Sequence, residues 1–305
     1  MNPAYTGQGF LQVKVTTESP VVPISGARVR ISDPTDGTVL QELTTNSSGQ
    51  TEPVDLPTPP LEYSVNAGEP KPYASYSVTV FAEGFKTLHI GGVQLLPSGL
   101  ALQPAALTPA TAGGINVQNR YISPHTLWGD FPPKIPEDEV KPLPDADGLV
   151  VLPKPVIPEY IIVHLGKPSD QGVPNEWVLF RDYIKNVACS EIYATWARET
   201  IKANVLAIIS FTLNRVYTEW YRGKGYDFTI TNSTAYDQSF VPGRTIFEEI
   251  SVVVDDLFNT YITREGAGQP LLTQYCDGRQ TQCNGLSQWG SQALGEQGWD
   301  AISIL

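Results

Sequence analysis

The chain has 305 residues, of which 41% are hydrophobic and 17% are charged, and its formal net charge is −12. This length fits two domains, and the composition is that of a folded protein rather than a disordered one. The acidic charge disfavours a nucleic-acid partner, because a phosphate backbone needs a basic surface, and it disfavours electrostatic attachment to an anionic membrane.

The start of the chain predicts no secretory signal. Residues 1–10 have neither a basic beginning nor an apolar core, and both are required of a Sec signal peptide. Nothing in the sequence approaches the run of about 18 apolar residues that a membrane helix needs. We expect either a trimmed chain or a protein that reaches its site by another route.

Residues 1–107 are predicted to form a β domain. Apolar and polar residues alternate in 11–16 and again in 27–32, and this period of two marks half-buried strands. Turn residues such as Asp36-Gly37 and Ser48-Gly49 separate the runs. Several short strands between regular turns predict an antiparallel β-sandwich.

A proline-rich stretch follows, with ten prolines in the 51 residues of 108–158. Because proline fixes φ and lacks an N–H group, the stretch is predicted to have no regular structure and to lie extended between domains. Proteolysis is expected at its exposed start, 111–117. The side chains expected to dock it on the next domain are Tyr121, His125, Leu127, Trp128 and Phe131.

Residues 159–305 alternate between helix and strand patterns, which predicts an α+β domain. Residues 160–164 are a short apolar run typical of a buried strand. Apolar residues then recur at three- and four-residue steps, which predicts an amphipathic helix from Thr195, its N-cap, to about Tyr221. An extended region is predicted for 226–243, a helix for 244–262 and a strand for 271–276.

Glu191 is the candidate catalytic residue. It lies between two helical patterns and is followed by Ile192, Tyr193 and Trp196. Such apolar surroundings would raise the pKa of the carboxyl, as general-acid cleavage of a glycosidic bond requires. Taken alone, the residue is more simply interpreted as a surface glutamate in a helix–helix loop.

The three cysteines leave two possibilities open. Cys276 and Cys283 are close enough in sequence to close a small disulfide loop, with Cys189 outside it, or all three are reduced. The three histidines are dispersed along the chain, at positions 89, 125 and 164. No zinc site and no other cofactor is therefore expected.

The order of motifs in the second half resembles the SpoIID/LytB family, named for stage II sporulation protein D. The likeness begins with Val187–Glu191 (VACSE), Trp196 and Glu199–Val205 (ETIKANV). It continues in positions that match a second family block and a closing one, namely Asp227, Gln238, Phe240 and Gly243, then Leu286–Ser291 (LSQWGS), Gln297-Gly298 and Ile304-Leu305.

Catalytic members of this family are peptidoglycan lytic transglycosylases, so the resemblance implies that Glu191 is a single acid/base. The 6-hydroxyl of muramic acid would replace the water and second carboxylate of an ordinary glycosidase, giving a 1,6-anhydromuramic product. Gln238, Ser287 and Gln288 are then expected to contact the substrate, and Tyr236 and Trp289 to stack on sugar. Alternatively, Ser287 and Gln288 cap the following helix, and the two aromatic residues belong to the core.

The chain also departs from the family pattern. Positions where some members hold zinc carry Ala235-Tyr236-Asp237, and the positions before the closing block carry Gln282-Cys283-Asn284. Two other functions therefore stay open. One is a non-catalytic peptidoglycan-binding or scaffold protein, and the other is a muramidase that uses water.

A second resemblance concerns the N-terminal part. Residues 23–29 (PISGARV), 46–49 and 76–85 resemble the carboxypeptidase-regulatory or transthyretin-like sandwich family, whose modules serve as spacers, binding domains or pro-segments. Together with residues 121–137, the arrangement is similar to clostridial spore cortex-lytic enzymes. These enzymes imply a proenzyme in the spore cortex, coat or cell wall, with glycan strands and an activating protease as partners.

Overall fold

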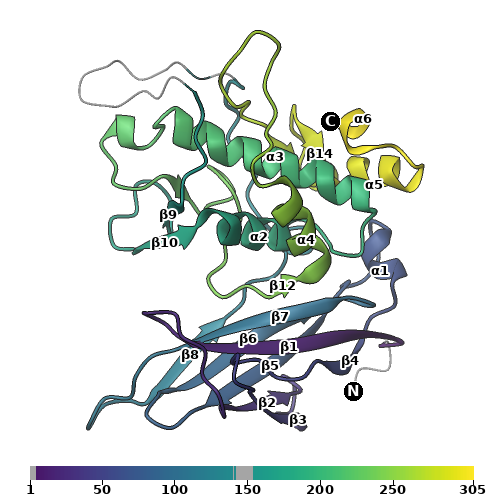
Figure 1. Cartoon of the computed structure of the whole chain (residues 1–305). Helices are drawn as coiled ribbons and strands as arrows, with labels where there is room; N and C mark the ends of the chain where they lie inside the picture. The colour runs from purple at the N-terminus through teal and green to yellow at the C-terminus, as the bar shows by residue number, and fades with distance from the viewer. Residues whose placement is uncertain (1–4, 140, 142–153) are drawn as a thin grey trace. The chain divides into compact units, whose positions relative to one another are not determined.

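The computed structural model describes residues 5–139, 141 and 154–305. The protein is a mixed α/β fold with several sheets, and it divides into two compact units. Most of their elements are labelled in Figure 1. The first unit consists of residues 1–124, 193–195 and 241–249, and the second of residues 125–192, 196–240 and 250–305.

The first unit contains a four-stranded and a five-stranded sheet, with strand orders β12-β7-β1-β4 and β3-β2-β5-β6-β8. The sheets are mixed rather than wholly antiparallel as predicted, because β1 pairs with β7, and β6 with β8, in parallel. The elements are β1 (Gly7–Thr17), β2 (Arg28–Ser32), β3 (Val39–Thr44), β4 (Val54–Thr58), α1 (Glu62–Val65), β5 (Ala74–Phe81), β6 (Thr87–Leu95), β7 (Leu100–Leu107), β8 (Val117–Tyr121) and β12 (Ile246–Phe247).

The alternation seen in the sequence accounts for the core of the first unit. Leu11, Val13 and Val15 of β1 are fully buried, while Lys14 between them is exposed. Successive side chains of a strand point to opposite faces, so each strand contributes one apolar face. The expectation that 108–158 lacks regular structure is wrong at β8, which completes the ladder beside β6.

The second unit is built around the helix α3. Its elements are β9 (Tyr160–His164), β10 (Asn175–Leu179), α2 (Phe180–Glu191), α3 (Arg198–Tyr217), η1 (Arg222–Lys224), β11 (Ile230–Thr231), β13 (Tyr275–Cys276), β14 (Leu286–Ser287), α5 (Gln288–Glu296) and α6 (Ala301–Ile304), and α4 (Glu248–Leu257) begins within residues 241–249 of the first unit. The helix α3 packs against α2, α5 and α6. Among the described residues, none of the helices has the length and apolar character that crossing a membrane demands.

The helix α3 is buried on nearly all sides, not on the single face that its apolar spacing predicted. The spacing misses this because Ser210 and Thr212 are buried by bonding back to the carbonyls of Leu206 and Ile208, at 2.7 and 2.8 Å. The helix begins at Arg198, so Thr195 is not its N-cap. The Thr195 hydroxyl instead donates to Ser64 Oγ at 2.9 Å within the first unit.

The predicted helix 244–262 is shorter than expected, since α4 covers only Glu248–Leu257 and the preceding β12 pairs with β7. Residues 125–139 belong to the second unit. They are fastened there by hydrogen bonds from Thr126 Oγ1 to the Ser190 carbonyl (2.9 Å) and from Ile135 N to the Ala235 carbonyl (2.7 Å). Residues 142–153, also within the predicted linker, lie outside the described residues.

Candidate active site

Glu191 is the last residue of α2, and its side chain is only 6% exposed. The chain leaves the helix at Ile192 in an extended conformation. Glu191 Oε1 accepts a hydrogen bond from the Ser239 backbone N–H at 2.8 Å. The glutamate is thus an interior group and not the surface residue of a helix–helix loop.

Gln288, the first residue of α5, contacts Glu191 from a distant part of the sequence. Its Nε2 donates to the Glu191 carbonyl at 2.9 Å and approaches Oε2 at 3.4 Å, across 97 positions of sequence. Gln288 is 2% exposed. The closing motif of the chain and the end of α2 therefore meet, as the resemblance implied for Gln288.

Two further groups surround the Glu191 carboxyl. Lys134 is partly accessible as a residue, but its Nζ atom is buried and has no hydrogen-bond partner among the described residues. That atom lies over the rings of Phe211 and Tyr275, at 4.8 and 4.3 Å from their centroids. The Tyr275 hydroxyl is buried and makes no hydrogen bond of standard geometry within the described part of the chain.

These surroundings shift the pKa values of Glu191 and Lys134. Burial raises the pKa of the Glu191 carboxyl, although the Lys134 charge and the hydrogen bonds from Ser239 and Gln288 oppose the rise. Burial lowers the pKa of the Lys134 ammonium, and the negative charges of Glu191 and Asp237 counteract that change. A carboxyl that keeps its proton at higher pH than usual has the property that a general acid needs.

The Glu191 carboxyl lines a cavity of about 60 Å³. This is room for about two water molecules and not for a sugar ring. The walls come from residues between 126 and 134, from Thr234 and Gln288, and from β13 and the loop after it, which includes Asp277, Gln280 and Thr281. A whole sugar ring could therefore enter this cavity only if one of these walls moved.

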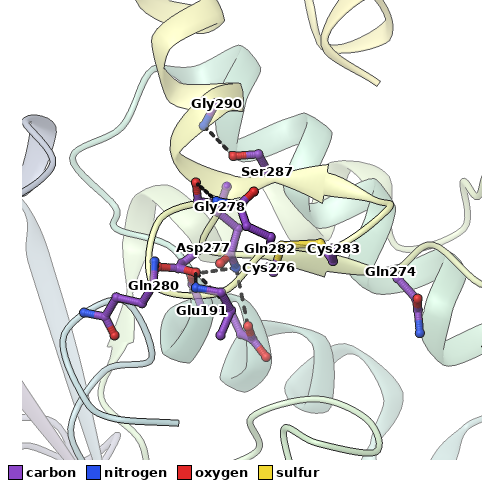
Figure 2. Close-up of a disulfide and its surroundings, with 12 residues drawn as sticks. Glu191, Gln274, Cys276, Asp277, Gly278, Gln280, Gln282, Cys283, Ser287 and Gly290 are labelled. Atoms are coloured by element: carbon purple, nitrogen blue, oxygen red, sulfur yellow. Dashed lines mark hydrogen bonds between the residues drawn. A yellow bond between two sulfur atoms is a disulfide. The ribbon is translucent and has the colours of Figure 1, made fainter. Parts of the chain in front are cut away.

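A disulfide between Cys276 and Cys283 closes that loop, which resolves the choice that the cysteine count left open. Figure 2 shows Asp277 and Gln280 on the loop and Glu191 close by. At Gly278 φ is +77°, and an added Cβ would lie 1.9 Å from Ser287 Oγ, so the turn needs glycine. Cys189 lies outside the disulfide and is buried in α2.

Asp277 is a second carboxylate on the same cavity. Burial acts to raise its pKa, but hydrogen bonds from Thr281 and Gln280 outweigh it and hold the pKa below the ordinary value. Those bonds run from Thr281 N and Oγ1 to Oδ1, at 2.7 and 2.6 Å, and from Gln280 N to Oδ2 at 2.7 Å. Glu191 and Asp277 are therefore two carboxyl groups whose environments shift their pKa values in opposite directions.

Gln238 is not on the cavity wall, although the resemblance assigned it a substrate contact. It is fully buried. Its Oε1 accepts from the Tyr183 hydroxyl at 3.1 Å and lies 2.8 Å from Thr212 Oγ1, and its Nε2 donates to the Ile208 carbonyl at 3.1 Å. With both ends of its amide in use, Gln238 joins α2 and α3 next to Ser239, which holds Glu191.

Ser287 caps α5, which was the alternative to substrate contact. Its Oγ accepts from the Gly290 backbone N–H at 3.0 Å, as shown in Figure 2. Trp289 packs against Trp196 with ring centroids 5.0 Å apart. Tyr236 borders a different cavity of about 670 Å³, together with Trp220 and Tyr226. None of these three residues lines the Glu191 cavity.

Three other aspartates of the second unit do not line the Glu191 cavity. Asp237 is buried in an ion pair with Arg215 at 2.7 Å. Asp227 accepts from Asn175 at 2.9 Å, and Asp182 is exposed in the first turn of α2. Over residues 5–139, 141 and 154–305, no three His, Cys, Asp or Glu side chains are grouped as a metal site requires.

Sequence reasoning missed Lys134, Ser239, Tyr275 and Asp277. Ser239 acts through its backbone N–H, which no residue type reveals, and Tyr275 is an ordinary core aromatic by its sequence context. The signal for Asp277 was its place beside Cys276, because a disulfide loop fixes its neighbours. Lys134 lies within the segment that was expected to dock on this domain, but an isolated lysine between prolines suggested no site.

Comparisons with known proteins give only local likenesses. No protein-family model matches the chain, and no curated protein matches it. Among solved structures, the Bacillus anthracis TIE protein is similar over 34% of this chain and 17% of its own, at 15% identity and a TM-score of 0.23.

Two other solved structures are similar over a comparable share. GBS52, the minor pilin of Streptococcus agalactiae, is similar over 36% of this chain and 48% of its own, at 11% identity and a TM-score of 0.25. The Klebsiella pneumoniae 5-hydroxyisourate hydrolase is similar over 34% of this chain and 94% of its own, at 15% identity and a TM-score of 0.21. At such TM-scores, no activity follows for this chain.

Proposed function

We propose that the protein is a peptidoglycan lytic transglycosylase that cleaves the bond between N-acetylmuramic acid and N-acetylglucosamine, with Glu191 as its acid/base. The observation that carries the proposal is a buried carboxyl of raised pKa at the end of α2, held by Gln288 from a remote part of the chain. The motif resemblance supplies the substrate class.

In the proposed reaction, protonated Glu191 gives its proton to the glycosidic oxygen while the bond from C1 of muramic acid to that oxygen breaks. The resulting carboxylate then accepts the proton of the muramic acid 6-hydroxyl as its oxygen bonds to C1. Glu191 ends protonated, no water is consumed, and the product carries a 1,6-anhydro ring. One group acts in both steps, as general acid and then as general base.

The chain's own residues determine how Glu191 performs these steps. The Ser239 N–H and the Gln288 amide fix the carboxyl by hydrogen bonds to its two oxygens, at 2.8 and 3.4 Å. Held in one rotamer, the carboxyl loses little entropy when a substrate oxygen comes within reach. Because the cavity is about 60 Å³, the proposal requires that residues 126–134 or the disulfide loop move when glycan binds.

The same proposal covers the rest of the chain. Residues 1–107 would be a transthyretin-like β-sandwich that acts as a pro-segment or targeting module, and residues 159–305 a SpoIID-like α+β domain. The site of action would be spore cortex or cell wall, with glycan strands as the main partner. Cleavage by an activating protease between about Ala110 and Tyr121, a stretch in which residues 111–117 are exposed, would raise activity.

One observation favours a second candidate function, a water-using muramidase. Asp277 shares the Glu191 cavity and its pKa lies below the ordinary value, so it would be ionised when Glu191 is protonated. Two such carboxyls suit an acid and a base that activates water. Three hydrogen bonds within its own loop already engage Asp277, which is why the single-acid mechanism is preferred.

Mass spectrometry of the products separates these functions. The protein is incubated with purified spore cortex and with vegetative cell walls, and the soluble muropeptides are analysed. Products with 1,6-anhydromuramic ends support the transglycosylase, and products heavier by one water molecule support the muramidase. Retention of the protein on insoluble peptidoglycan without any soluble product would instead indicate a binding or scaffold protein.

A further inference from the structure

The unusual group near Glu191 is the Lys134 ammonium. Its Nζ atom is buried and, among described residues, no hydrogen-bond acceptor contacts it. An ammonium has three donors, and burying it without acceptors costs free energy unless another charge compensates. The aromatic faces of Phe211 and Tyr275, at 4.8 and 4.3 Å, supply only part of that compensation.

The segment that carries Lys134 is fastened by the residues that directly follow it. Ile135 N donates to the Ala235 carbonyl at 2.7 Å, and the Ile135 carbonyl accepts from Gln274 Nε2 at 3.1 Å. Glu137, three residues after Lys134, forms an ion pair with the fully buried Arg215. These contacts hold the lysine against the cavity that Glu191 lines.

We propose that Lys134 is a positioning residue for the Glu191 site, whose fixed charge stabilises the Glu191 carboxylate after it has given up its proton. The kinetic part of this inference rests on the proposed function, while the electrostatic coupling of the two side chains does not. Lys134 keeps its proton throughout and forms no bond with the substrate. Its role is to make a buried carboxyl a usable acid.

Burial alone would make Glu191 too weak an acid to release its proton readily. A cation within a few ångströms lowers the pKa of a carboxyl by about one to three units, which opposes the effect of burial. The charged groups that act on Lys134 besides Glu191 are Asp237, Glu137 and Arg215, and the titratable residues Tyr275 and Asp277 line the same cavity. Asp237 and Glu137 are both paired with Arg215, at 2.7 and 2.5 Å. Asp277 accepts hydrogen bonds from its own loop, so Glu191 is the acid left for Lys134 to stabilise.

Nuclear magnetic resonance measures the coupling without any substrate. Glutamate labelled with ¹³C at the carboxyl is incorporated, and the Glu191 resonance is the one missing from the Glu191→Gln variant. In Lys134→Met we expect the Glu191 titration to move to higher pH by about one unit, and in Lys134→Arg to stay near the wild-type position. Lys141→Met is the matched control, because Lys141 is a buried lysine of the same segment that pairs with Glu137 instead.

The reciprocal measurement guards against loss of folding in the lysine variants. Removing the Glu191 charge should lower the pKa of Lys134, so its ¹⁵Nζ resonance in Glu191→Gln should titrate at lower pH than in the wild type. If both resonances titrate in the variants as they do in the wild type, the inference is overturned, whatever the activity.

The pH–rate profile is a further test, because a lysine with a merely structural role would not shift it. Because the active form of Glu191 is protonated, a higher pKa moves the alkaline limb of the pH–rate profile upward. Lys134→Met should show this shift, with a limiting rate about three- to tenfold lower, since only part of a one-unit pKa change reaches the rate. If Glu191→Gln retains activity but the two titrations remain coupled, the proposed function fails and the coupling stands.

Discussion

The Gln288 amide donates to the backbone carbonyl of Glu191 at 2.9 Å and lies 3.4 Å from its carboxyl oxygen Oε2, although the residues are 97 positions apart. A single side chain thus ties the start of α5 to the end of α2. Both residues are buried, so water cannot replace this hydrogen bond if it is lost. The position of the Glu191 carboxyl therefore depends on the correct placement of the C-terminal helices.

Replacing Gln288 by Ala tests this dependence. The variant leaves the Glu191 carbonyl without its donor, and its free energy of unfolding should be lower than that of the wild type by about 1–3 kcal/mol. Its activity should fall by about tenfold or more, because the carboxyl loses a contact that fixes it. Gln292→Ala is the control, since Gln292 is a buried glutamine of the same helix that accepts from Ala197 N at 3.1 Å. An equal loss of activity in both variants would show that only the placement of α5 matters.

The raised pKa of Glu191 predicts how stability depends on pH. Because burial raises its pKa in the folded state, the folded protein binds the proton more tightly than the unfolded chain does. This contribution to stability is complete below the ordinary pKa of glutamate and is lost as pH rises through the folded-state pKa. Glu191→Gln should therefore gain stability relative to the wild type as pH rises through that range.

Urea unfolding of both proteins across this pH range provides the measurement. The control is Asp182→Asn, which replaces an exposed carboxyl at the other end of α2. Its stability should change with pH as that of the wild type does. A constant difference between wild type and Glu191→Gln at every pH would contradict the raised pKa.

The Cys276–Cys283 disulfide should stabilise both the fold and the cavity wall. Replacing both cysteines by Ser should lower the free energy of unfolding by about 2 kcal/mol, because a short closed loop no longer restricts the unfolded chain. The Asp277 loop would then be held less firmly beside Glu191, so KM for glycan should rise more than kcat falls. A reductant should reproduce both effects in the wild type and change nothing in the double variant. Unchanged KM and kcat after reduction would show that the disulfide loop does not contribute to the site.

Ser287 should matter for stability and not for catalysis. Ser287→Ala removes the acceptor of the Gly290 N–H and should cost about 1 kcal/mol, while activity at a temperature well below unfolding stays at the wild-type level. Ser287→Asp keeps a capping acceptor and should restore the lost stability. A large fall in kcat for Ser287→Ala, without restoration by Asp, would support the substrate contact that the resemblance implied.

Local patterns predicted much of the first unit and little of its topology. The two-residue alternation of Leu11, Val13 and Val15 located β1, because burial on one face leaves a direct mark on the sequence. The parallel pairing of β1 with β7 and the addition of β12 to this sheet depend on residues far apart in the chain. No local pattern carries that information.

The same limit applies to the candidate site. Glu191 and Gln288 were predicted from motif order, and the structure brings them together. Gln238 was assigned to the substrate by the motif resemblance, whereas both ends of its amide have partners inside the protein, namely Thr212, Tyr183 and Ile208. Lys134 was missed because its importance comes from what surrounds its Nζ atom, not from its neighbours in sequence.

The measurement that tests the account most directly is a comparison of wild type and Glu191→Gln on purified spore cortex. The glutamine has nearly the same shape and can still accept from Ser239 N–H, so its fold, checked by circular dichroism, should match the wild type. We predict that the wild type releases muropeptides with 1,6-anhydro ends and that the variant releases them at least about 100-fold more slowly. Release at the wild-type rate by the folded variant would show that Glu191 is not the acid.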